Sequence, residues 1–393
     1  ALIDGARNRM KSGHPIVIDG SRQKEPAGGL WEDLDPMGRG RVQILNVDGA
    51  ETAQAEQVMS EMLRLSKLDP LWEWSNAAVI ARQWKLLDPV YAYCQANNIP
   101  AQLADRDPLQ FWRLRETQLL VEWLSERGSN PLKPTELDTF LKRQSDGPWW
   151  ELLREAIDSY RLECGDGPLP AIHLKEWLAE WGREIRKRQQ GLLLVTAHRV
   201  KGLEFDHVAV LDGNWQDRGD DEDPDAACRL YYVAMTRARK TLTLARRALS
   251  NGPAYSLLTL PSVCMRNAPS PGMPSHILER EYMTLTPANV DIGFAGRFHP
   301  RNRVHAILKR LQPGDALQLT RAKEQWLFEY NGQVVGRLAR SFNPPQNMYC
   351  IQARVHAMLV RFRMDSDPLY ADSIECDRWE VVIPELVFAP PIG

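Results

Sequence analysis

An arginine interrupts an apolar helical stripe in RLYYVAMTRARKTLTL, residues 229–244. Read as a helix, four residues spaced i, i+3, i+4 and i+7 share one face: Leu230, Val233, Ala234 and Arg237. A guanidinium group on that face needs an anion. Its planar donors match phosphate oxygens, and its charge persists at physiological pH. The sequence therefore predicts that Arg237 binds a phosphate group.

A second arginine and a histidine directly follow apolar strands. Arg82 ends NAAVIAR (76–82), and His198 lies just beyond LLLVT (192–196). In open α/β sheets, ligands bind at the carboxyl ends of the strands. We expect Arg82 and Arg237 to converge on this edge of a sheet. Two arginines at one edge predict a polyphosphate ligand.

The elements that must position these side chains follow a strand–helix–strand order. After NAAVIAR, Asp88 and Pro89 are a helix start signal, and IPAQL (99–103) returns to an extended pattern. The same order recurs from GLLLVTAHRVKGLEFDHVAVLDG (191–213) through the helix quoted above to the alternating TLTLAR. This order predicts an α/β fold with a parallel sheet.

Composition along the chain predicts five parts. Helical patterns such as WWELLREAIDSY and HLKEWLAEWGREIRKRQQ predict a helical insertion, and PSVCMRNAPSPGMPS is typical of a linker. Beyond it, strands separated by NG predict hairpins. The expected division is an α/β domain in two parts (1–104 and 191–260), the helical insertion (105–190), the linker (261–290) and a small β-rich domain (291–393).

Overall composition is that of a soluble protein. The chain has 393 residues and a formal net charge of -2, with 44% hydrophobic and 25% charged residues. Its six cysteines form no C-x-x-C pair and do not cluster with histidine, so we expect reduced thiols of an intracellular protein and no metal site. No run is long enough to span a bilayer, and no signal-peptide segment is present. We expect a cytoplasmic protein.

Three motifs, in the same order, carry a family resemblance. TAHRVKGLEFDHVAVLDG resembles motif V of the UvrD/Rep/PcrA-type superfamily 1 DNA helicases, and RLYYVAMTRARKTLTL resembles their motif VI. AAVIARQW is similar to motif IV. The stretch around motif VI also resembles the C-terminal part of long bacterial RecQ-family fusion proteins. The resemblance implies a RecA-like, P-loop NTPase-type domain, the second of two that sandwich ATP.

The resemblance also implies residue roles. Arg237 and Arg82 correspond to the arginines that reach the γ-phosphate, and Glu204 and Gly202 lie near the nucleotide. The loop that couples nucleotide state to the grip on single-stranded DNA includes Thr196, His198, Arg199 and Lys201. The implied activity is that of an ATP-dependent 3′-to-5′ DNA helicase or translocase. The implied process is DNA repair, and the implied partner is single-stranded or 3′-tailed duplex DNA.

The phosphate cradle of such motors is missing. No G-x-x-x-x-G-K-[ST] motif occurs, nor any GK dipeptide, so the domain lacks its own Walker A. VAVLD, ending at Asp212, imitates a Walker B strand, but its place inside motif V indicates a structural role. We expect a first RecA-like domain upstream of Ala1 to bind most of the ATP and Mg²⁺. The chain alone is then an inactive, monomeric, nucleoid-associated motor half; the alternative is a non-catalytic DNA- or protein-binding module that keeps the fold.

The C-terminal segment is basic. Residues 291–363 hold twelve Lys or Arg against four Asp or Glu, a net of +8, interleaved with aromatics that include Trp326. Basic charge with aromatics is typical of a nucleic-acid surface, and the segment weakly resembles HIRAN-type β domains, which bind DNA ends. Three roles remain open for this segment: DNA binding with Trp326 as a stacking platform, protein docking, and a structural cap. The following residues, 364–393, hold seven acids and one arginine.

Overall fold

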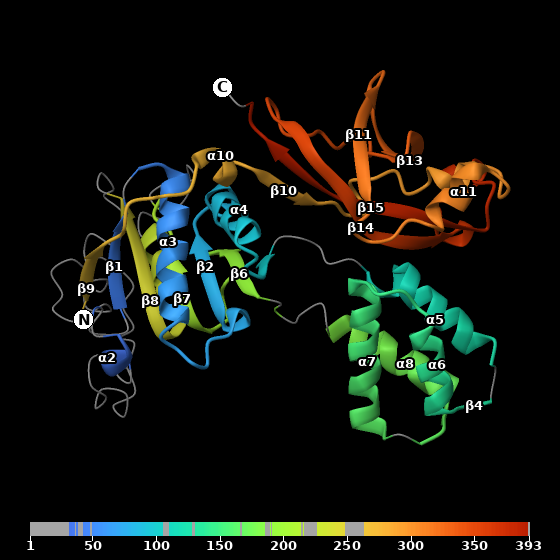
Figure 1. Ribbon diagram of the computed structural model, residues 1–393, viewed down its shortest axis with the longest axis horizontal. Coiled ribbons are helices and arrows are strands. Elements are labelled where there is room, and N and C mark those ends of the chain that lie inside the picture. The colour runs from blue at the N-terminus through green and yellow to red at the C-terminus, as the bar shows by residue number, and fades with distance from the viewer. Residues whose placement is uncertain are drawn as a thin grey trace. The chain divides into compact units, whose positions relative to one another are not determined.

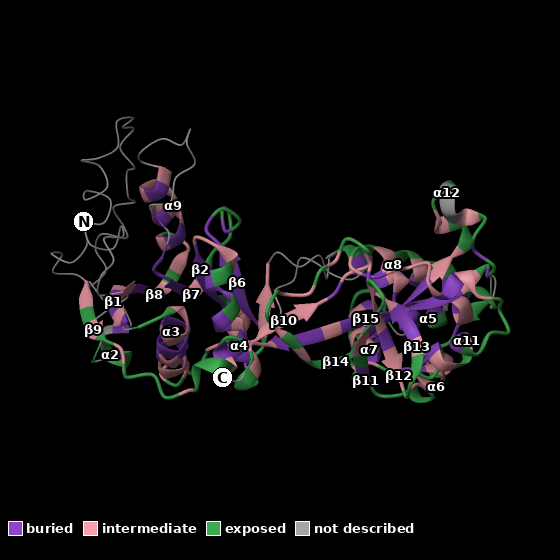
Figure 2. Ribbon diagram, turned by 90° about the horizontal axis from the view of Figure 1, so that it is seen from above, coloured by how far each residue is buried: buried purple, intermediate pink, exposed green. Residues whose placement is uncertain are grey.

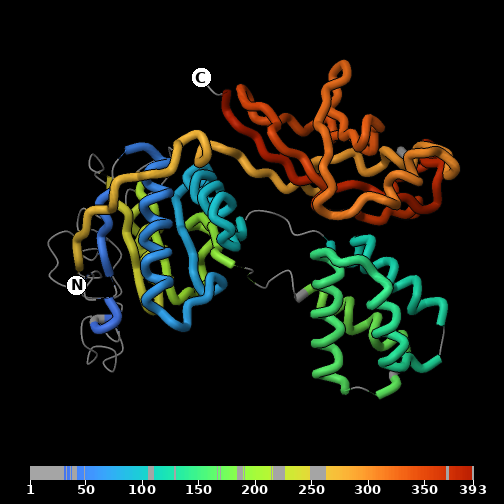
Figure 3. Tube along the Cα trace, viewed as in Figure 1, coloured from blue at the N-terminus to red at the C-terminus, as the bar shows by residue number. Residues whose placement is uncertain are grey.

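The computed structural model describes residues 31–35, 37, 42–47, 49–104, 110–127, 130–165, 167–184, 189, 191–213, 215, 226–247 and 263–391. The chain divides into two units (Figure 1). Unit 1 contains the described parts of 1–105 and 189–281, and unit 2 those of 106–188 and 282–391. The chain therefore leaves unit 1 after its third strand, returns to it at residue 189 and leaves it again near residue 281, a path that Figure 3 traces.

Unit 1 is built on a parallel sheet of seven strands. The strand order is β3-β6-β2-β7-β8-β1-β9, and every strand pair is parallel. Strands β2 and β6 are buried along their whole length, as expected for central strands covered on both faces. The predicted parallel α/β fold is confirmed. The strands are β1 (Val42–Val47), β2 (Ala77–Ala81), β3 (Ala101–Leu103), β6 (Leu192–Thr196), β7 (Phe205–Val210), β8 (Ala238–Arg247) and β9 (Cys264–Asn267).

Helices cover both faces of this sheet. α3 (Glu51–Ser66), α4 (Asp88–Ala96) and the short α10 (Ser275–Leu278) share a core with one face. α9 (Ala226–Met235) packs on the opposite face, as Figure 2 shows. α4 begins at the predicted Asp88, with Pro89 in its first turn. Shorter helical elements are α2 (Trp31–Leu34) and the 3₁₀ helices η2 (Trp74–Asn76) and η3 (Trp84–Leu86).

The expected linker contains regular structure from residue 263 onward. β9 pairs with β1 at the edge of the seven-stranded sheet, and α10 packs on α3 and α4. β10 (Glu281–Thr284) joins the second sheet. Pro269, Ser270, Pro271 and Pro274 lie between β9 and α10, so a composition typical of linkers did not prevent regular structure on either side of them. The part before residue 263 lies outside the described residues.

Unit 2 combines four longer helices with an antiparallel sheet. The helical elements are η4 (Phe111–Arg113), α5 (Arg115–Ser125), α6 (Pro134–Lys142), α7 (Pro148–Cys164) and α8 (Ala171–Glu184), with a small sheet of β4 (Pro131–Leu132) and β5 (Leu169–Pro170). The larger sheet has the order β10-β15-β14-β11-β12-β13. Its other strands are β11 (Ala316–Ala322), β12 (Gln325–Tyr330), β13 (Gln333–Arg337), β14 (Tyr349–Phe362) and β15 (Arg378–Ala389). Short helical elements are η7 (Ala295–Arg297), α11 (Arg303–Leu308), η8 (Arg363–Asp365) and α12 (Pro368–Ala371).

The predicted hairpin turn at NG is present between β12 and β13. Asn331 and Gly332 both have positive φ, 49° and 72°, as a two-residue type I′ turn requires. Asparagine and glycine are the residues that adopt this backbone conformation at least cost. The β-rich character of the C-terminal part is thereby confirmed.

The helical insertion and the C-terminal β-rich segment share one core, which differs from the expected division. Buried residues of α5, α7 and α8 belong to the same apolar cluster as those of β14 and β15. Leu114 forms a β-bridge with Leu359, and Trp149 Nε1 donates to the backbone oxygen of His356 at 2.9 Å. The apolar face of each helix was evident from its periodicity, but periodicity does not identify the surface that the face covers.

A buried histidine in unit 1 predicts pH-dependent stability. His207 on β7 lies 3.3 Å from Asp69 and 2.9 Å from Thr241 Oγ1, and its ring stacks on Trp72. Burial lowers the pKa of His207 to about 4 from its usual 6.5. Because the unfolded chain takes up the proton first, this site's contribution to stability is complete above pH 6.5 and is lost as pH falls toward 4. We expect a loss of about 3 kcal/mol over that range.

Urea unfolding at a series of pH values checks this expectation. The His207→Asn variant should be less stable at neutral pH and should lack this part of the acid loss. Burial opposes the lowering of the Asp69 pKa, which the hydrogen bond from Leu71, Lys240 and His207 produce, so the variant keeps the Asp69 contribution apart from the part due to His207. An acid loss of the same size in the variant would contradict the assignment to His207.

Candidate functional site

The carboxyl edge of the parallel sheet holds Arg82 and His198. β2 and β6 are neighbours in register, with Ala81 opposite Thr196, so the residues that follow them emerge together. The backbone N–H of Ala197 donates to the oxygen of Ala81 at 2.9 Å. One ring nitrogen of His198, Nε2, contacts Nη1 of Arg82. The expected placement of these two side chains at one edge is therefore observed.

A pocket of 220 Å³ opens beside this pair. It is lined by Arg82, His198 and one side of α9, where Ala226, Arg229, Leu230 and Val233 lie. The buried side of α9 is different and consists of Ala227, Tyr231 and Ala234. Leu230 and Val233, expected to be part of a buried stripe, are thus half-exposed walls of a basic pocket.

The residues that follow His198 continue along this edge and then cross the sheet. Thr196 is buried, and its backbone oxygen accepts from the N–H groups of Arg199 and Val200, which closes a tight turn. Arg199 is exposed, with its guanidinium carbon 5.8 Å from the ring centre of Trp84. Lys201 is also exposed, in the connection 197–204 that leads from β6 to β7.

Arg237 lies at the opposite edge, so the expected convergence with Arg82 is wrong. α9 carries the chain from the carboxyl edge back to the amino edge, and Arg237 directly precedes the first residue of β8. The ten residues of α9 extend about 15 Å between the two positions. Because all strands are parallel, a residue just before a strand and one just after a strand cannot share an edge.

The guanidinium group of Arg237 is held by three hydrogen bonds. Nε donates to the backbone oxygen of Val233 at 2.9 Å, Nη1 to that of Leu203 at 3.1 Å, and Nη2 to Thr236 Oγ1 at 2.9 Å. These bonds use three of its five N–H groups. One N–H on each terminal nitrogen remains for a ligand.

Glu204 and Gly202 gather at this amino edge with Arg237. The backbone N–H of Phe205 donates to the oxygen of Arg237 at 2.8 Å, which places Glu204 beside it. Glu204 is exposed and pairs with Arg239 at 3.2 Å. Gly202 has a φ of +88°, a conformation that a side chain would strain. Three of the four residues expected near a nucleotide are therefore together, and Arg82 is separate from them.

Two other residues singled out in the sequence, Asp212 and Trp326, have different surroundings. Asp212 is held structurally, because its Oδ2 accepts the backbone N–H of Arg247 at 2.8 Å and its backbone is bonded on both sides to Gln54. Trp326 belongs to unit 2, on the β11–β12 hairpin, where the guanidinium carbon of Arg321 lies 5.6 Å from its ring centre.

Arg229 is the site residue that sequence reasoning missed. It lines the pocket with Arg82 and His198 at the carboxyl edge, and the described residues that line this pocket include no carboxylate. Its signal was present, since positions 226, 229, 230 and 233 follow helical spacing on a second face of α9. Over the described ranges, no group of three or more His, Cys, Asp or Glu side chains could hold a metal ion. Among the described helices, none is long and apolar enough to cross a membrane.

Comparison with known proteins gives a family match over the segment that contains the motif V and motif VI sequences described above. Residues 191–245 match the family model of the UvrD-like helicase C-terminal domain. Among solved structures, the chain is similar to the C-terminal domain of a possible DNA helicase from Lactobacillus plantarum WCFS1, with 14% identity and a TM-score of 0.29, over 57% of this chain and 84% of that one. The comparison with curated proteins gives no match. The matched segment spans β6, the crossing connection, β7, α9 and most of β8.

Proposed function

Because residues 191–245 carry a UvrD-like helicase C-terminal domain, we propose that this chain is the C-terminal motor half of an ATP-dependent 3′-to-5′ DNA helicase or translocase. One observation carries the proposal. The connection 197–204 holds His198 at the carboxyl edge of the sheet and Glu204 at the amino edge, beside Arg237. A shift of this connection at one edge is transmitted to the other edge without an intervening helix.

The amino edge is the proposed nucleotide side. Arg237, fixed by its three hydrogen bonds, offers its two remaining N–H groups to the γ-phosphate of ATP held by a partner RecA-like domain that supplies the phosphate cradle and Mg²⁺. Such a preorganised donor stabilises charge that develops on the transferring phosphoryl group. Glu204 and Gly202 border the same edge and suit the ribose side of the nucleotide.

The carboxyl edge is the proposed single-strand side. Arg82, His198, Arg199 and Arg229 present positive or hydrogen-bonding groups beside the apolar walls of Leu230 and Val233. Phosphates would bind to the cations, while sugars and bases contact the apolar walls. We therefore assign Arg82 to DNA rather than to ATP, since it lies at the edge opposite Arg237.

Replacing Arg82 by glutamine should weaken single-strand binding. One lost phosphate contact is expected to lower the affinity about fivefold near 0.1 M salt and to reduce the log–log salt slope by about 0.7. Fluorescence anisotropy with a labelled oligonucleotide on the 393-residue chain measures both quantities. The matched control is Lys85→Gln, an exposed cation on the neighbouring η3 that should change little.

The same variant separates the two possible roles of Arg82. Unchanged DNA affinity, together with lost ATP turnover at saturating DNA in the two-domain motor, would return Arg82 to the nucleotide site. The alternative function, a non-catalytic module that retains the fold, predicts DNA or protein binding without any ATP turnover once the phosphate-cradle domain is supplied.

A further inference from the structure

Unit 2 carries a cluster of cations on and beside α11, which we name the α11 face. Its members are all exposed, and among the described residues none pairs with a carboxylate: Arg301, Arg303, Lys309 and Arg310. Arg303 is the first residue of α11, and Lys309 and Arg310 lie in the turn that directly follows its last residue, Leu308. The span from Arg303 to Arg310 is about 10 Å.

The α11 face is rigidly mounted. Val304, Leu308 and Leu311 are buried on the opposite side of the helix. Asn302 caps its start, with Oδ1 accepting the N–H of Val304 at 3.0 Å. His305 Nε2 lies 3.3 Å from the oxygen of Phe298 and 3.5 Å from Cys376 Sγ. The cations are therefore presented on a fixed surface.

The acidic segment that follows does not neutralise this face. Three of its carboxylates pair with other arginines: Asp365 with Arg113 at 2.6 Å, Glu380 with Arg115 at 3.6 Å, and Glu385 with Arg354. Glu375 and Asp377 are exposed and flank Cys376, which contacts His305 of α11, so these two acids lie beside α11. They form no ion pair with the described cations of the α11 face. The charge of the face is available to a partner.

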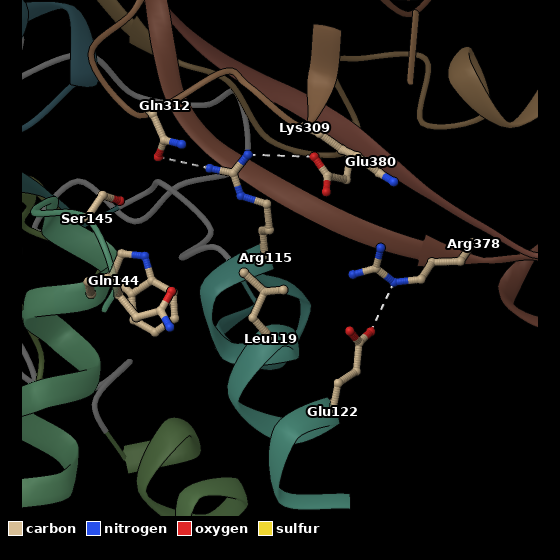
Figure 4. A pocket seen from close by; sticks show the side chains of 10 residues that line it. Arg115, Leu119, Glu122, Gln144, Ser145, Lys309, Gln312, Arg378 and Glu380 are labelled. Carbon is tan, nitrogen blue, oxygen red and sulfur yellow. Dashed lines mark hydrogen bonds and ion pairs between the residues drawn. The ribbon is translucent and has the colours of Figure 1, made fainter. Parts of the chain in front are cut away.

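The neighbouring pocket does not account for these cations. It has a volume of 330 Å³ and lies between α5, the α6–α7 loop, the end of the α11 turn and β15 (Figure 4). Inside it, Arg115 pairs with Glu380, and Arg378 pairs with Glu122 at 3.0 Å. Lys309 lines the same pocket without such a partner among the described residues. The pocket thus holds two ion pairs and one additional cation, Lys309, which also belongs to the α11 face.

We propose that the α11 face binds the phosphate backbone of duplex DNA, without reading its sequence. Duplex DNA carries one charge per 1.7 Å of helix axis with both strands counted, so the 10 Å of duplex beside this face contains about six phosphates, against about three on a single strand. Single-strand sites also use aromatic platforms, and residues 301–310 include no aromatic besides His305, which faces Phe298 and Cys376. The proposal is independent of the motor assignment, because it concerns cations of unit 2 alone.

The test compares two variants with equal charge change in the intact 393-residue chain. Arg303→Gln/Arg310→Gln removes two cations from the α11 face, and Lys142→Gln/Arg143→Gln removes two exposed cations from the end of α6. Binding to a blunt, closed-end duplex is measured by anisotropy at several salt concentrations. The first variant should lose affinity about 50-fold near 0.1 M salt and about 1.8 from the log–log slope. The second should stay within about twofold of the parent.

A third variant and two competitors complete the test. Glu375→Gln/Asp377→Asn should tighten duplex binding, because it removes negative charge beside the face. Single-stranded DNA and polyglutamate of matched charge should compete less well than duplex. Equal losses in the two double variants, or polyglutamate competing as well as duplex, would overturn the proposal; the latter result would identify an acidic protein as the partner. Thermal melts confirm that each variant is folded.

Discussion

Replacing Arg237 by alanine is expected to lower ATP turnover by roughly 10³- to 10⁵-fold in the motor that contains both RecA-like domains, the range found for arginines that act across a cleft. DNA affinity should remain, because the carboxyl edge with His198 and Arg82 is about 15 Å away along α9. The assay is phosphate release with saturating single-stranded DNA, beside anisotropy on the same preparation.

Two further variants distinguish a direct phosphate contact from a structural role. Arg237→Lys keeps the charge but cannot hold Val233 and Leu203 while also donating two N–H groups, so turnover should stay low. Arg239→Ala removes an exposed cation from the start of β8, where it pairs with Glu204, and should change turnover little. Near-normal turnover in the Arg237→Ala protein would leave this residue as a brace between α9 and the crossing connection.

Replacing Arg115 by alanine should destabilise unit 2 by about 3–5 kcal/mol. Arg115 is buried, donates to the backbone oxygen of Leu311 at 2.8 Å and lies 3.3 Å from Glu116 and 3.6 Å from Glu380, both of them buried carboxylates. Burial raises the pKa of Glu116, and Arg115 opposes that rise. Without Arg115 both carboxylates remain in the interior with no cation.

Urea unfolding, monitored by a spectroscopic signal from unit 2, measures the change in the free energy of unfolding. Arg154→Ala, which removes a half-buried arginine 3.9 Å from a fully exposed Asp146, should cost less than about 1 kcal/mol. Adding Glu116→Gln and Glu380→Gln to Arg115→Met should recover much of the loss, since neutral groups need no counter-charge. If the alanine variant is as stable as the Arg154 control, this cluster does not hold the helices to the sheet.

Local sequence located the central strands of the α/β unit. Continuous apolar runs located β2 and β6, the alternating TLTLAR located β8, and the Asp88–Pro89 signal located the start of α4, whereas β9 lies in the segment expected to be a linker. The edge of the sheet at which Arg237 lies could also be predicted, because Arg237 directly precedes β8. Helical spacing shows which face of the helix carries Arg237, but the edge follows from the direction in which the helix runs. The spacing of Arg229 and Leu230 also pointed to the pocket once α9 was placed on the sheet.

The pairing of the helical insertion with the C-terminal sheet could not be predicted from periodicity. Leu174 and Leu178 mark the apolar side of α8 in the sequence, and both are buried. α8 packs on α5 and α7, and the cluster that these helices share also contains Met358 and Ile383, more than 100 residues further along the chain. Apolar contacts are non-directional, so an amphipathic helix specifies that it must be covered but not by which surface.

The assembly of unit 2 from two distant segments has a consequence during synthesis. The helices between residues 106 and 188 leave the ribosome before the strands that cover them, and about 200 residues separate the end of α8 from the end of β15. At 5–20 residues per second, this interval lasts roughly 10–40 s. During it, the seven-stranded sheet acquires β6 to β9 and is completed, while α5, α7 and α8 can pack only on one another, without the strands of their shared core. The nascent chain is therefore most exposed to aggregation, and most in need of a chaperone, after its first unit has already folded.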